Sequence, residues 1–130
     1  MRTELLAYFS THLTGTIKLS GELPWEQGGQ ALYRQNLKRI YVDDEQTVKS
    51  VLQPLLSEDD IMQTVTTVRC YLAMDAKNKS SDLDATLAVF AQARTQSGVT
   101  NSFRNEMDIT TELDQSVEIY TIEYRFYTVA

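Results

Sequence analysis

The chain contains 130 residues, of which 12 are lysine or arginine and 18 are aspartate or glutamate, so its formal net charge is −6. Each half carries six of the basic and nine of the acidic residues, so the acidity is spread evenly and is not a tail. A nucleic-acid-binding domain needs a cationic surface to displace counterions from phosphate, and this composition excludes that class. The length and the 42% hydrophobic content predict one compact domain over residues 1–130.

The composition also indicates the compartment. Cys70 is the single cysteine, so no internal disulfide can form, which is typical of a reducing environment. The longest apolar run, residues 87–91, is far shorter than the ~20 residues of a membrane-spanning helix. The first residues lack the apolar core and cleavage site of a signal peptide. We therefore expect a soluble product, made in the cytoplasm, that does not associate with a membrane.

A short amphipathic helix is expected first, with Thr3 as its N-cap and Gly15 as its C-cap. Residues 17–23 have a weak extended pattern, and residues 24–30, with Pro and Gly-Gly, predict a loop or hairpin turn. The apolar positions that define the helical face are Leu5, Leu6, Phe9 and Leu13.

Residues 38–42 form the first clear strand pattern, and Asp43-Asp44 ends it. Residues 45–56 are ambiguous: the spacing favours a short helix, although Pro54 would disturb its interior. Residues 57–60 predict a polar turn. The helical stripe in the ambiguous segment consists of Val48, Val51, Leu52 and Leu55.

Residues 63–74 predict a long strand, followed by a polar loop over 75–81. Ser81 and Asp84 resemble a capping box for a helix that Gly98 would close. The apolar stripe of that helix is Leu83, Leu87, Phe90 and Ala91.

The C-terminal part is again rich in strand formers. Residues 99–104 are a possible strand, and residues 107–113 and 117–129 predict a hairpin that turns at Asp114-Gln115. The order of the elements predicts an α+β fold: a mostly antiparallel sheet with a long C-terminal hairpin and two or three helices packed on one face. The face expected to point inward on the last strand carries Tyr120, Ile122, Tyr124 and Phe126.

The chain offers little catalytic material. With one histidine, His12, and one cysteine, it cannot supply a typical zinc site, and no phosphate-binding glycine motif is present. Cys70 lies in a strand among apolar residues, which favours a buried thiol. The acidic clusters at 43–45 and 58–60 are best interpreted as solvated turns, although a pair of carboxylates on a hydrolase remains an alternative. We expect no enzymatic activity, no cofactor and no metal.

The sequence resembles the tail terminator, or minor tail, proteins of bacteriophages with long non-contractile tails. The likeness is in layout and length. The stretches that carry it are ELPW (22–25), LYRQN (32–36) and IYVD (40–43), then YLAMDAKN (71–78) with the helix at 83–93, and finally EMDITTE (106–112) with VEIYTIEYRF (117–126).

This resemblance implies a structural protein of the virion tail. Such proteins form a hexameric ring that caps the tail tube protein, ends its polymerisation and offers a surface to the head–tail connector proteins. DNA passes through the ring without specific binding, and an acidic channel would repel its phosphates. The role implies interface residues in place of an active site. The candidates are Trp25, as an exposed aromatic anchor, and Lys77 and Lys79, as partners for an acidic neighbour.

Besides the hydrolase, two alternatives remain open. A head–tail joining or neck protein of the same virion would have similar size and ring symmetry. A small-molecule or peptide-binding α+β module belongs to a different class.

Overall fold

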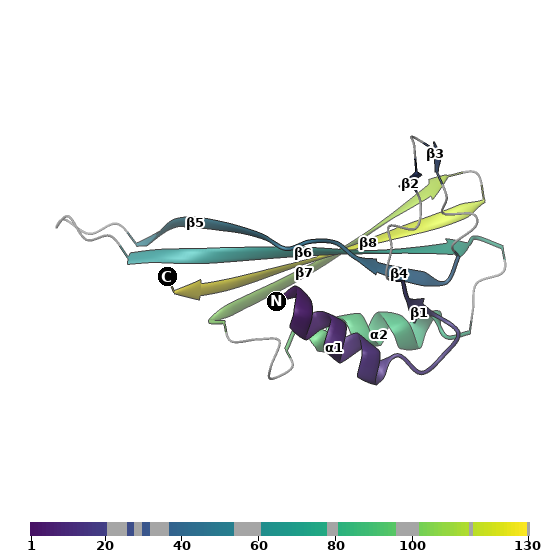
Figure 1. Cartoon of the computed structure of the whole chain (residues 1–130), viewed down its shortest axis with the longest axis horizontal. Helices are drawn as coiled ribbons and strands as arrows, with labels where there is room; N and C mark the ends of the chain where they lie inside the picture. The colour runs from purple at the N-terminus through teal and green to yellow at the C-terminus, as the bar shows by residue number, and fades with distance from the viewer. Residues whose placement is uncertain are drawn as a thin grey trace.

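The computed structural model describes residues 1–20, 26–27, 30–31, 37–53, 61–77, 81–95, 102–114 and 116–129. These residues form an α+β fold with two helices and a mostly antiparallel six-stranded sheet (Figure 1). The elements in chain order are α1 (Arg2–His12), β1 (Lys18–Leu19), β2 (Glu26–Gln27), β3 (Gln30–Ala31), β4 (Arg39–Val42), β5 (Gln46–Gln53), β6 (Ile61–Asp75), α2 (Leu83–Ala93), β7 (Arg104–Asp114) and β8 (Val117–Val129).

The sheet is built around the long strand β6. Its strand order is β1-β4-β6-β8-β7, and β5 also pairs with β6. One side of β6 pairs with β8 from Gln63 to Asp75. The other side is shared, because β4 pairs with residues 70–72 and β5 with residues 61–67. The sheet is therefore edged by β1 and β5 on one side and by β7 on the other, and only the β1–β4 pair is parallel.

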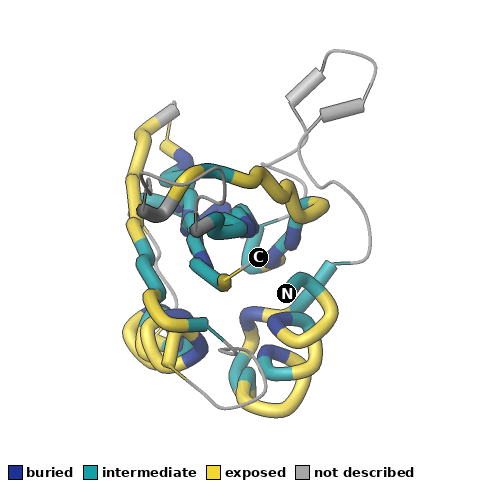
Figure 2. The backbone as a smooth tube through the Cα atoms, turned by 90° about the vertical axis from the view of Figure 1, so that its left-hand side faces the viewer, coloured by how far each residue is buried: buried dark blue, intermediate teal, exposed yellow. Residues whose placement is uncertain are grey.

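Both helices lie on the same face of this sheet (Figure 1), and the core lies between them and the sheet. Phe9 of α1 meets Phe90 of α2 edge to face, with ring centroids 5.2 Å apart. The buried Tyr124 of β8 donates a hydrogen bond of 2.7 Å from its hydroxyl to the carbonyl oxygen of Phe90. This bond satisfies a polar group that would otherwise be costly to bury. Figure 2 shows the buried residues gathered where sheet and helices face one another.

Several sequence predictions are confirmed. The strand patterns at 38–42, 63–74 and 117–129 correspond to β4, β6 and β8, and the four residues predicted to point inward on the last strand are buried. The C-terminal hairpin is the β7–β8 pair, in which Asp114 faces Val117. The predicted turn at Gly28-Gly29 lies outside the described residues, but the strands β2 and β3 on either side of it pair antiparallel.

The prediction of a short helix over residues 45–56 is wrong, because Gln46–Gln53 form the strand β5. The long strand β6 extends beyond β4, and β5 satisfies the backbone groups along that free length. Val48 and Val51 fall on opposite faces of the strand and are both exposed, so their helical spacing does not reflect burial.

The helix ends also differ from the predictions. Met1, not Thr3, is the N-cap of α1, and Leu13, not Gly15, is its C-cap. Asp82 is the N-cap of α2, and no side-chain hydrogen bond caps that helix, so the Ser81–Asp84 capping box does not form. Ala91 is exposed, and the buried residues of α2 are Leu83, Thr86, Phe90 and Ala93. The predicted turn at 57–60, the cap at Gly98 and the segment 99–101 lie outside the described residues.

Candidate interaction surfaces

Of the three residues proposed from the sequence as interface candidates, the structure describes only Lys77. Lys77 is exposed just after β6, and its backbone N–H donates to the carboxylate of Asp75 at 2.9 Å. Trp25 and Lys79 lie outside the described residues. Lys77 therefore stays available to a partner, while the other two predictions have no structural test.

The acidic cluster at 43–45 is used for local structure. Glu45 accepts hydrogen bonds from the Met1 amine at 3.2 Å and from the backbone N–H of Arg2 at 3.3 Å, which ties the start of α1 to the sheet. Asp43 accepts a bond from the backbone N–H of Asp44 at 2.8 Å. In the part of the chain that the structure describes, no three metal-ligating side chains gather. The cluster at 58–60 lies outside those residues.

Cys70 and His12, the single cysteine and the single histidine of the chain, also have structural roles. Cys70 is fully buried in β6, and burial raises the pKa of its thiol. A raised pKa keeps the thiol protonated and unreactive at neutral pH. The ring of His12 stacks on that of Tyr8, with centroids 4.0 Å apart, and its Nδ1 lies 2.9 Å from the carbonyl oxygen of Tyr8 one turn earlier.

The sheet face opposite the helices carries a ladder of alternating charges. Arg125 of β8 is at its centre and binds Glu106, Asp108 and Glu123. Glu123 also accepts a bond from Arg69 of β6 at 2.8 Å. The ladder is completed by Arg104, which pairs with Glu106 and lies over the Tyr127 ring. Three arginines thus meet three carboxylates, and this face presents paired charges to any partner.

The ladder changes how its members titrate. The hydrogen bond from Arg125 lowers the pKa of Glu106 below its ordinary value. Burial raises the pKa of Glu123, but the bonds from Arg69 and Arg125 outweigh this effect, so the pKa is lowered overall. The hydrogen bonds that Arg125 donates to Asp108, Glu106 and Glu123 raise its own pKa. All of these groups stay charged at neutral pH.

Apolar side chains are exposed on the outer strands of the sheet. On β5, Val48 is 63% exposed and Val51 47%. On β7, Leu113 is 70% exposed and Ile109 38%. Sequence reasoning missed these surfaces, because exposure of a strand residue depends on which neighbours pair beside it. One feature of the sequence did hint at the β7 surface: Ile109 and Leu113 are apolar residues in a strand that is otherwise rich in acidic residues and threonines.

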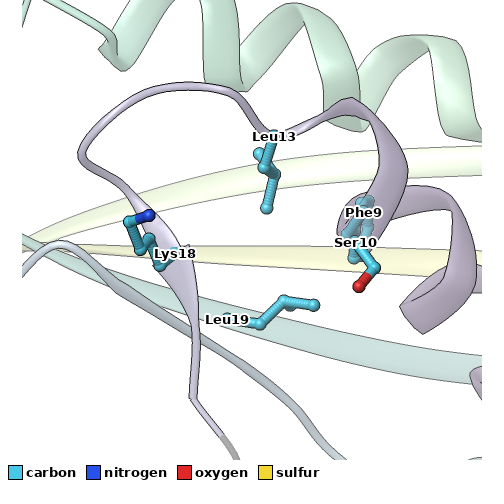
Figure 3. A pocket seen from close by; sticks show the side chains of 5 residues that line it. All are labelled: Phe9, Ser10, Leu13, Lys18 and Leu19. Carbon is cyan, nitrogen blue, oxygen red and sulfur yellow. The ribbon is translucent and has the colours of Figure 1, made fainter.

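A small hollow lies at the other end of the sheet order, between α1 and β1 (Figure 3). Its volume is about 180 Å³, and it is lined by Phe9, Ser10, Leu13, Lys18 and Leu19. Leu13 and Leu19 point into the same space from the two sides, with Ser10 on the rim formed by α1 (Figure 3). The hollow combines apolar walls with one cationic side chain.

Comparison with protein-family models and with curated proteins finds no match to this chain. Among the described residues, no helix has the length and apolar character needed to cross a membrane.

Proposed function

We propose that this chain is a structural protein of a phage tail, of the tail terminator kind. It closes as a ring on the end of the tail tube, stops tube polymerisation and presents a surface to the head connector. The single observation that carries this proposal is the exposure of apolar side chains on two unlike outer strands of one sheet. Val48 and Val51 mark the β5 side, and Ile109 and Leu113 mark the β7 side.

Two unlike surfaces are what a ring subunit requires. A closed ring grows by head-to-tail contacts, so each copy must carry two different and complementary patches. A ring that also caps a tube needs a further contact surface along its axis. The β5–β6 hairpin projects beyond both helices (Figure 1), which suits it to such an axial contact.

The charge distribution agrees with passage of DNA through such a ring. The chain carries a net charge of −6, and the three arginines of the ladder, Arg69, Arg104 and Arg125, are each paired with a carboxylate. Paired arginines are poor partners for phosphate, because binding would require breaking an existing ion pair. A DNA molecule would therefore meet little attraction at the ladder.

The alternative functions draw less support from the same residues. A hollow of about 180 Å³ is smaller than the roughly 300–1,000 Å³ of most ligand pockets, so a small-molecule-binding module is less favoured. The carboxylates suggested for a hydrolase, such as Asp43, make local backbone contacts. A head–tail joining protein would use the same kinds of surface, and separating it from a terminator requires an experiment on the virion.

The experiment is removal of the gene from the phage that carries it, followed by electron microscopy of the particles. Tails of uncontrolled length are expected for a terminator. Tails of normal length with unattached heads would instead assign the chain to head–tail joining. Normal, infectious virions would contradict both functions. Complementation with the wild-type gene is the control, because it must restore whichever defect is seen.

A further inference from the structure

We draw no further inference here: the strongest candidate, the outer edge of β5 with Val48 and Val51 exposed on its two faces, has no partner strand among the described residues, and nothing in the structure shows what covers it.

Discussion

The carboxylate of Asp82 accepts two hydrogen bonds from Thr16, a residue 66 positions earlier in the chain. The backbone N–H of Thr16 donates at 2.7 Å and its hydroxyl at 2.9 Å, both to Oδ2. Asp82 is the N-cap of α2, and Thr16 lies in the connection between α1 and β1. One side chain therefore holds the start of the second helix against the end of the first. This connection also leads into the strand that lines the hollow.

Replacing Asp82 with alanine should destabilise the fold. Both bonds are to a charged acceptor, and their loss should lower the free energy of unfolding by about 1–2 kcal/mol. The measurement is chemical denaturation followed by circular dichroism. Asp84→Ala is the control, because Asp84 is exposed in the first turn of α2 and makes only the favourable helix-dipole interaction, of about 0.3–1 kcal/mol. Equal losses for the two variants would contradict a specific role for Asp82.

Gly15→Ala should be destabilising for the same reason. A Cβ at position 15 would lie 2.4 Å from Cγ and 2.9 Å from Cβ of Asp82, so the aspartate would have to move away from Thr16. We expect the loss to approach that of Asp82→Ala. In the Asp82→Ala background the clash with the carboxylate is gone and only the contact with the Cβ of residue 82 remains, so Gly15→Ala should cost less there than in the wild-type chain. A double-mutant cycle measured by denaturation gives the coupling free energy between positions 15 and 82. Additive effects of the two substitutions would contradict the clash.

The Asp82–Thr16 contact also illustrates what could be predicted from the sequence. The helix at Leu83–Ala93 and the alternating strand at 117–129 were predictable, because one buried face imposes a period on the residues. The strand β5 was not, since it is an edge strand with exposed valines on both faces and no burial period. The segment becomes a strand because part of β6 is left unpaired by β4, and this depends on the tertiary arrangement of the chain.

The candidate surfaces were less predictable than the fold. Lys77 is exposed, and its predicted role at an interface stays a prediction; the exposure of Leu113 follows from the strand order and not from its own neighbours in the sequence. The hollow likewise requires knowing that β1 lies beside β4 and under the end of α1. In the second helix, the same dependence on packing buries Thr86 and exposes Ala91, contrary to their polarity.

Ser116→Gly should stabilise the β7–β8 hairpin. Ser116 precedes β8 with a φ of 119°, a region that residues with a side chain rarely adopt. Such strain costs about 1–3 kcal/mol, and glycine removes it at an entropic cost of about 0.5–1 kcal/mol. A net gain of about 1 kcal/mol in the free energy of unfolding is expected from denaturation. The variant Lys38→Gly should gain less stability, because the φ of Lys38 is 62°, which is less strained. A loss of stability in the Ser116 variant would show that its backbone is not strained.

Arg125→Met should weaken the dependence of stability on acid pH. The pKa values of Glu106 and Glu123 are held below their ordinary value of 4.5 by Arg125, with Arg69 also acting on Glu123. A carboxylate whose pKa is lower in the folded state contributes stability above its unfolded pKa, and that stability is lost as pH falls through the folded value. The wild-type chain should therefore lose stability steadily below about pH 4.5. Without Arg125 the two folded pKa values rise, so this loss should become shallower while stability at neutral pH decreases.

The control for this prediction is Arg94→Met, which removes an exposed arginine at the C-cap of α2, away from the ladder. Its stability should follow the wild-type slope between neutral pH and pH 3. The Arg125 variant should also lose the sensitivity to salt that paired surface charges confer, because added ions screen the ladder only where it exists. Parallel pH profiles for the wild-type and Arg125→Met proteins would mean that the ladder does not control the titration of Glu106 and Glu123. Such a result would leave the three arginines as separate surface charges, open to phosphate, and would remove one support for a sheet face that lets DNA pass.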